Sequence, residues 1–214
     1  MNFTNTLTGL ALAVALVSCG GTKTEETKTT ASTAVTPVTE AQEVVKYNVE
    51  TSSSSIDWSG SITTGTYGHT GTINITEGNI EITGDKVSGG EFTVDVNSIV
   101  TTDDSYSEGH EKEKLVGHLK SADFFHTEEF PTATFTIKSN SEAGVIGHLT
   151  VRGKTNEETI TDVTTTTAEN GDVIITGNLT FDRQKYDVAY ESTMKDMVIS
   201  NDIKLTITLT AKKK

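Results

Sequence analysis

Cysteine, basic residues and long apolar runs are scarce in this sequence of 214 residues. With one cysteine the chain has no internal disulfide. The 17 Lys and Arg residues are outnumbered by 30 Asp and Glu residues, so the formal net charge is −13. This acidic balance argues against nucleic acid and anionic membrane surfaces as partners. The apolar run Leu10–Val17 is too short to span a bilayer.

That apolar run is typical of the hydrophobic region of a secretory signal, and the one cysteine, Cys19, lies just after it. Ser18 and Leu16 before the cysteine resemble a bacterial lipobox, although residues 2–10 contain no Lys or Arg. We expect residues 1–18 to be a lipoprotein signal peptide. Lipidated Cys19 would then anchor the protein in the membrane of a bacterial cell envelope, on the periplasmic or surface side. The alternatives are an ordinary cleaved signal and a buried N-terminal segment.

Residues 22–45 are rich in Thr, Glu and Lys and contain no aromatic residue. Such a stretch buries too little apolar surface to offset the entropy lost on ordering. We therefore expect residues 19–45 to form a flexible tether and residues 46–214 to form the folded domain.

From Tyr47 onward, apolar and polar residues alternate, which is typical of half-buried antiparallel strands with Thr on the solvent side. Clear examples are Phe92–Asn97, Ala133–Ile137 and Ile203–Leu209, and clusters of Gly and Asn mark turns between the runs. The pattern predicts an all-β fold of about eight strands, either a sandwich or a closed barrel.

One interval breaks this alternation, and its composition predicts a helix from about Glu108 to Lys120. A shorter turn or helix is expected around Ser192–Met197. Phe124 and Phe125 follow the longer helix. Phe135 lies in the next expected strand, residues 132–139. We expect Phe135 to point inward, one of the two adjacent phenylalanines to plug the barrel end, and the other to pack under the helix.

Several segments resemble the YceI-like lipid-binding family. The clearest read GEFTVDVNSI at 90–99, GHLKSADFF at 117–125, FPTATF at 130–135, GHLTVRGKT at 147–155 and FDRQKYDV at 181–188. The resemblance runs from about Tyr47 to Ala211 in order and departs after Val188. It implies an extended, lipocalin-like antiparallel β-barrel with one short helix near its mouth. It also implies a polyisoprenoid or other long-chain amphipathic lipid inside the barrel.

An eight-stranded barrel is just wide enough for side chains or for one small ligand. We expect small inward residues, Gly147 and Gly177 among them, to leave room along its axis. The expected ligand is a non-covalently bound isoprenoid or quinone-type lipid, with no other cofactor. The residues expected to contact it are Trp58, His69, Ile73, Ile75, Phe92, Val94, Phe135, Ile137, Leu149, Val151 and Phe181. His69 would bond a ligand head group at the mouth or, alternatively, act as a turn histidine bonding backbone.

Motifs for catalysis are missing: there is no Gly-x-Ser-x-Gly elbow, no His-Glu-x-x-His pair and no phosphate-binding glycine loop. On a helix, His110 and His118 would lie about 12 Å apart, too far to share one metal ion. Asp182 and Arg183 suggest an ion pair at a strand end. We therefore predict a binding protein without a metal or an enzymatic activity. An enzyme acting on a hydrophobic substrate and a purely structural envelope protein remain the alternatives, and the sequence does not identify a protein partner.

Overall fold

The computed structural model describes residues 42–192 and 197–214, and residues 41–214 form one folded unit. The predicted signal peptide, Cys19 and nearly all of the predicted tether lie outside the described residues. The helices within the described part are all too short or too polar to cross a membrane.

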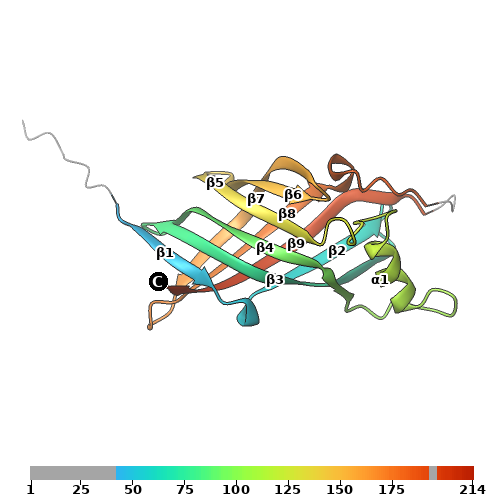
Figure 1. Cartoon of the computed structure of the whole chain (residues 1–214), viewed down its shortest axis with the longest axis horizontal. Coiled ribbons are helices and arrows are strands. Elements are labelled where there is room, and N and C mark those ends of the chain that lie inside the picture. Colours follow the sequence, from blue (N-terminus) through green and yellow to red (C-terminus); the bar gives the residue numbers. More distant parts are fainter. Residues whose placement is uncertain (1–41, 193–196) are drawn as a thin grey trace, which may run out of the picture. The chain divides into compact units, whose positions relative to one another are not determined.

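The described residues form nine strands and one α-helix, α1 (Lys112–Lys120) (Figure 1). Two short 3-10 helices, η1 (Thr51–Ser53) and η2 (Arg183–Tyr186), lie between strands. The strands are β1 (Val44–Val49), β2 (Ser55–Ile62), β3 (Gly68–Thr83), β4 (Lys86–Thr101), β5 (Thr132–Ser141), β6 (Gly144–Val151), β7 (Lys154–Thr167), β8 (Val173–Asp182) and β9 (Ile199–Lys213).

All strand pairs are antiparallel, in the order β1-β3-β2-β9-β8-β7-β6-β5-β4, and pairing of β3 with β4 closes the sheet. β1 and β2 share one position. β3 pairs with β2 through residues 68–73 and with β1 through residues 79–83, and β9 likewise pairs with both. The nine strands therefore fill eight positions of a closed barrel, which confirms the predicted fold class. β1 begins at Val44, because Val44 already pairs with Thr83.

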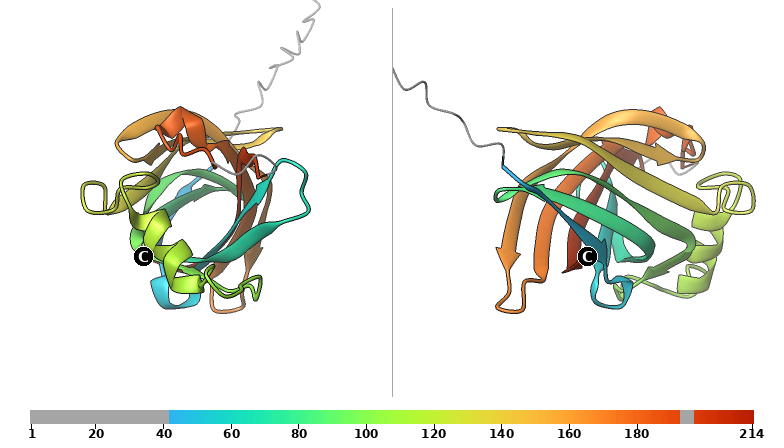
Figure 2. Two further views of the ribbon diagram at one scale, coloured as in Figure 1. Left: turned by 90° about the vertical axis from the view of Figure 1, so that its right-hand side faces the viewer. Right: turned by 60° about the vertical axis from the view of Figure 1, so that its left-hand side comes forward.

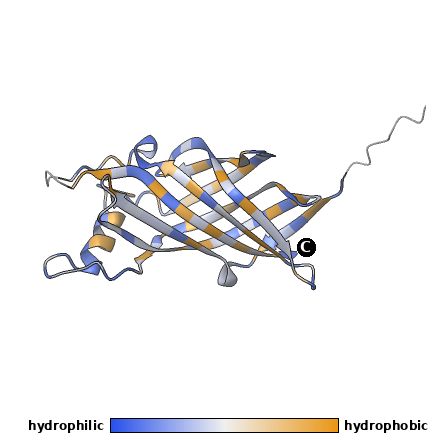
Figure 3. Ribbon diagram, turned by 180° about the vertical axis from the view of Figure 1, so that it is seen from behind, coloured by the Kyte–Doolittle hydropathy of each residue, from blue (hydrophilic) through white to orange (hydrophobic). Residues whose placement is uncertain are grey.

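Alternation along the strands separates the barrel interior from its surface. In β8, Val173, Ile175, Gly177, Leu179 and Phe181 are buried, and residues between them face outward. Seen from behind, the strands alternate between apolar and polar colours along their length (Figure 3). This is the inward and outward alternation expected of a barrel wall.

The connection between β4 and β5, residues 102–131, and the described residues between β8 and β9 lie at the same end of the barrel, with α1 at its rim (Figure 2). The predicted helix start at Glu108 was wrong by four residues. Gly109 has a φ of 84°, and residues 107 and 110 form an isolated bridge. Helical geometry is therefore excluded before Lys112.

The turn or helix predicted around Ser192–Met197 falls largely on residues 193–196, outside the described residues. A short helix that was not predicted, η2, follows β8 directly. The Asp182 carboxylate accepts a hydrogen bond from the Gln184 backbone N–H at 2.9 Å. Asp187 then ends the turn in the left-handed region, with a φ of 58°.

Candidate functional site

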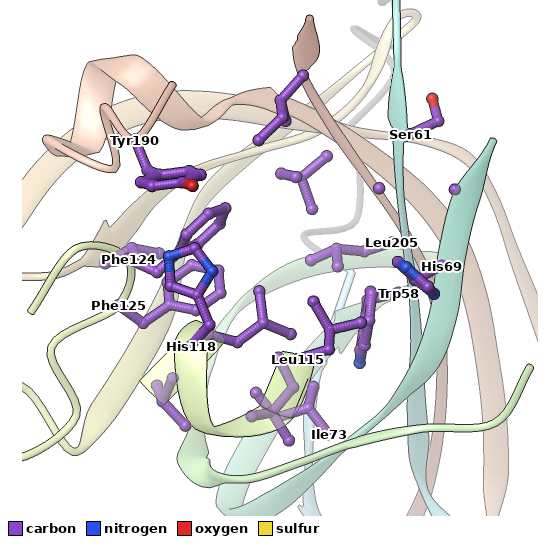
Figure 4. Close-up of a pocket in the computed structure, with 18 of the residues that line it drawn as sticks. Trp58, Ser61, His69, Ile73, Leu115, His118, Phe124, Phe125, Tyr190 and Leu205 are labelled. Carbon is purple, nitrogen blue, oxygen red and sulfur yellow. The ribbon is translucent and has the colours of Figure 1, made fainter. Parts of the chain in front are cut away.

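The half of the barrel nearest α1 encloses a cavity of about 410 Å³. Its wall consists mostly of inward-facing apolar side chains from the strands, and α1 and the long connections complete it. Figure 4 shows His118, Phe124, Phe125 and Tyr190 on one side and Trp58 and His69 on the other. The site is thus an apolar chamber with its polar groups close to one end.

Phe92 and Ile207 form the floor of this cavity. Both also line a second cavity of about 20 Å³ deeper in the barrel, so they separate the two. Phe92 pairs directly with Phe135 across β4 and β5, and the two rings stack with their centroids 5.7 Å apart. Beyond this partition the interior is filled by buried aliphatic side chains: Ile80, Val87, Ile137, Val145, Ile160 and Ile175. The large cavity is therefore blind at its deep end.

Two glycines expected to leave room for a ligand do not do so. A Cβ atom on Gly147 would lie 2.4 Å from Cε1 of Phe135, and one on Gly177 would lie 2.5 Å from Cγ2 of Ile160. Each glycine is needed because a neighbouring side chain occupies the space that its Cβ atom would fill.

Trp58 forms part of the cavity wall, as expected. Its Nε1–H donates to the Val100 carbonyl at 3.2 Å. This hydrogen bond passes over β3 at Gly71, the residue that pairs with Trp58. A Cβ atom on Gly71 would lie 2.7 Å from the indole ring and 1.8 Å from the Val100 oxygen. The ring's one polar group is thereby satisfied, and its apolar surface remains for the cavity.

Nine of the eleven residues predicted to contact ligand line this cavity: Trp58, His69, Ile73, Phe92, Val94, Phe135, Leu149, Val151 and Phe181. Ile75 and Ile137 are buried but do not line it, and Ile137 lies below the floor. Strand alternation identifies which side chains point inward, but not how deep the hollow part extends. Contact with a ligand stays a prediction for the whole set.

Tyr67, His69, Asp103 and Tyr106 form a polar group at the mouth, which we call the mouth cluster. His69 Nδ1 lies 3.2 Å from Asp103 Oδ1, and His69 Nε2 lies 2.9 Å from the Tyr67 hydroxyl. The Tyr106 ring stacks on His69 at 5.1 Å, and its hydroxyl donates to Asp103 Oδ2 at 3.2 Å. His69 is therefore held by side chains, and the alternative of a histidine bonding backbone is wrong.

Asp103 lies behind His69 and supplies the charge of the mouth cluster. Burial by itself would raise the pKa of its carboxyl group. Hydrogen bonds from the Thr70 and Ser105 backbone N–H groups, each 3.0 Å, and the nearby His69 ring outweigh burial and hold that pKa below its usual range. Burial, with the neighbouring Asp103 charge, raises the pKa of Tyr106. Asp103 is therefore an anion that accepts hydrogen bonds, and Tyr106 is a neutral donor.

The opposite side of the cavity comes from α1 and the connections. The His118 ring meets Tyr190 edge-on at 4.4 Å and Phe124 at 5.5 Å. Phe124 and Phe125 both line the cavity with rings 5.6 Å apart, so neither is confined to packing under the helix. The prediction missed Leu115, His118 and Leu119 as lining residues. Their i, i+3 and i+4 spacing places them on one face of a helix, which was an available signal.

The predicted ion pair between Asp182 and Arg183 is not formed among the described residues. Arg183, the first residue of η2, is buried, and its guanidinium donates to the backbone carbonyls of Ser200, at 3.0 Å, and Val188. Burial lowers its pKa. The buried cation therefore ties the end of β8 to β9, and it is not part of the cavity.

A family model described as a YceI-like domain matches residues 47–211. A UPF0312 protein of Staphylococcus aureus (strain USA300) is 38% identical over 96 residues, covering 41% of this chain and 55% of that protein. A second, from strain MRSA252, is 36% identical over 94 residues, with the same coverage. The chain therefore spans about half the length of the curated relatives it matches.

Two solved structures have a similar fold. Burkholderia cenocepacia BcnA has a TM-score of 0.63 at 18% identity, covering 77% of this chain and 99% of that chain. A polyisoprenoid-binding domain from Saccharophagus degradans, implicated in plant cell wall breakdown, has a TM-score of 0.58 at 13% identity, covering 79% and 99%. Both likenesses extend over nearly the whole of the described barrel.

Proposed function

Because this chain belongs to the YceI-like family, we propose that it binds the tail of a long-chain isoprenoid or similar amphipathic lipid in the barrel cavity. It does so outside the cytoplasm, held at a bacterial membrane by lipidated Cys19. The S. degradans neighbour is described as polyisoprenoid-binding, and a shared barrel makes the same ligand class the first choice here.

The observation that carries this proposal is the blind apolar cavity. Its floor of Phe92 and Ile207 offers no polar partner, while the mouth cluster lies at the other end. An amphipathic molecule therefore fits in one orientation, with its tail against the floor and its head at the mouth. Both a globular polar ligand and a lipid entering head first would leave polar groups unpaired against apolar walls.

The volume limits how much of a tail is enclosed. At about 30 Å³ per water-sized group, 410 Å³ holds about 14 methylene-sized groups, or close to three isoprene units. At about 0.8 kcal/mol each, their burial contributes about 11 kcal/mol. Association and ordering cost about 4–15 kcal/mol. The net affinity is modest, which favours a carrier that releases its lipid over a permanent store.

We propose binding without chemical conversion of the ligand. Both ring nitrogens of His69 are engaged, one by Asp103 and one by Tyr67, and Tyr106, which stacks on the ring, donates to the Asp103 carboxylate. This arrangement holds the ring in place at the mouth, away from the floor against which an apolar tail would lie, and so supports a positioning role.

The test uses the full chain carrying Cys19→Ser. Organic extraction followed by mass spectrometry identifies co-purifying lipid, and titration with farnesol, followed through quenching of Trp58, measures saturable binding. Ala133→Phe fills the cavity and is expected to weaken binding at least about tenfold. Thr132→Phe, one residue away on the exposed face, is the matched control and leaves binding unchanged. No lipid and no saturable binding by the parent protein would refute the proposal.

A further inference from the structure

The mouth cluster has a hydrogen-bonding pattern that constrains the head group of the ligand. Asp103 uses the hydrogen-bond donors around it: the N–H groups of Thr70 and Ser105 and the Tyr106 hydroxyl all point to its carboxylate. These are the groups that would otherwise bind an anionic head. A phosphate entering the mouth therefore meets donors that are already engaged.

The charge around the mouth also disfavours an anion. Asp103 is held ionised, so the mouth cluster carries a net charge of about −1 with neutral His69 and about zero with protonated His69. Among the described lining residues, Lys114 is the one Lys or Arg side chain, and its Nζ lies 2.8 Å from Glu111 Oε2. Neither protonation state of His69 therefore gives the mouth cluster a net positive charge that would attract a phosphate.

One acceptor of the mouth cluster remains available to a ligand. Tyr67 lines the cavity, and its hydroxyl makes one hydrogen bond among the described residues, to His69 Nε2. When it donates to a neutral imidazole, both of its oxygen lone pairs are free. When it accepts from a protonated imidazole, one lone pair is still free. Tyr67 can therefore accept a hydrogen bond from a ligand in either state.

We infer that the mouth cluster selects an uncharged head group bearing a hydroxyl, as in a prenol, quinol or phenol, and discriminates against phosphorylated isoprenoids. The hydroxyl donates to Tyr67 Oη, which His69 and Asp103 hold in position. This inference rests on the proposed function, because it assumes that an isoprenoid tail occupies the cavity.

The test compares three ligands with the same tail: farnesol, farnesyl methyl ether and farnesyl monophosphate, titrated into the full chain carrying Cys19→Ser. Farnesol is expected to bind about three- to tenfold more tightly than the ether, the range of one hydrogen bond. The phosphate is expected to bind most weakly. Tyr67→Phe abolishes the difference between alcohol and ether without weakening the ether. Tyr47→Phe, at a buried tyrosine of β1 that does not line the cavity, is the matched control and keeps that difference.

Asp103→Asn provides a second, independent variant, because it removes the charge and frees donors while preserving shape. It is expected to raise the affinity for the phosphate relative to farnesol by at least about tenfold, and thermal melting verifies that the variant is folded. Three outcomes would overturn the inference while leaving the proposed function intact. All three ligands could bind equally, the phosphate could bind most tightly, or Tyr67→Phe could weaken all three by the same factor. Absence of binding by any of them would instead refute the proposed function.

Discussion

At the scale of single residues, Phe92 decides how far a ligand can penetrate. Its ring separates the 410 Å³ cavity from the smaller one below. Phe92→Ala is expected to lower the free energy of unfolding by about 3–5 kcal/mol and to join the two cavities. The preferred tail then becomes longer, as measured by titration with prenols of increasing length. Phe130→Ala, which removes a phenylalanine packed on Gly153 away from the cavity, leaves the preference unchanged. An unchanged preference in Phe92→Ala would show that Phe92 is not the floor.

Asp103 makes stability depend on pH in a defined direction. Its pKa is lower in the folded protein than in the unfolded chain, so between the two pKa values the unfolded state binds more protons. Its contribution is fully present above its ordinary pKa of about 4 and is lost as the pH falls below that value. In urea unfolding at several pH values, the stability difference between the parent and Asp103→Asn should therefore shrink on acidification. A difference that is constant with pH would contradict this account.

Residue alternation predicted most of the lining but not the mouth cluster. Ile73, Phe92, Val94 and Leu149 are visible in the sequence because a strand has a period of two. His69 and Asp103 are 34 positions apart, and they meet because β3 pairs with the end of β4 when the barrel closes. A contact made by closing the barrel leaves no local pattern in the sequence, so it could not be predicted. The role of Gly147 was misjudged for the same reason, since the ring that fills its space belongs to another strand.

At the scale of elements, the turn between β6 and β7 holds the mouth together. Arg152 donates to the backbone carbonyls of Ala122, at 2.9 Å, and Asp187. Lys154 adds an exposed ion pair with Asp187 at 3.0 Å. The turn therefore ties the connection after α1 to the connection after η2.

This arrangement predicts an effect on ligand release. Arg152→Lys keeps the charge but replaces a guanidinium that reaches two carbonyls with one ammonium. Dissociation of bound farnesol, followed by stopped-flow fluorescence, should become about three- to tenfold faster. Lys154→Met removes only an exposed ion pair and should change the rate much less. Equal rates in the parent and Arg152→Lys would mean that the mouth opens elsewhere.

The helices were harder to predict than the strands. α1 was expected from composition, but its start depends on the backbone conformation of Gly109, which composition does not report. η2 was missed because four residues are too few to show a helical period, and its cap, Asp182, had been read as half of an ion pair. Short elements set by capping and buried backbone contacts, such as those of Arg183, are visible only in three dimensions.

At the scale of the whole molecule, the strand pattern predicted a closed or packed all-β fold of about eight strands. The sharing of one position by β1 and β2 follows from the interruption at η1 and was not foreseen. Nor does the sequence tell which half of the barrel is hollow, because inward aliphatic residues line the cavity and fill the core alike.

Membrane attachment is a separate prediction that depends on Cys19 alone. Replacing Cys19 with Ser should block processing at that position and move the protein from the membrane fraction to the soluble fraction, as followed by cell fractionation and immunoblotting. The folded domain lacks Cys19 and should keep its thermal stability. Retention of the variant in the membrane fraction would refute lipid anchoring without affecting the proposal for the cavity.

The most direct test of the account is the dependence of affinity on tail length. The full chain carrying Cys19→Ser is titrated with geraniol, farnesol and geranylgeraniol, which have two, three and four isoprene units. Because the cavity holds about 14 methylene-sized groups, affinity should rise at least about tenfold from geraniol to farnesol. It should then level off, since the fourth unit has no enclosed space. Absence of saturable binding, or an affinity that does not depend on tail length, would contradict a blind lipid-binding cavity.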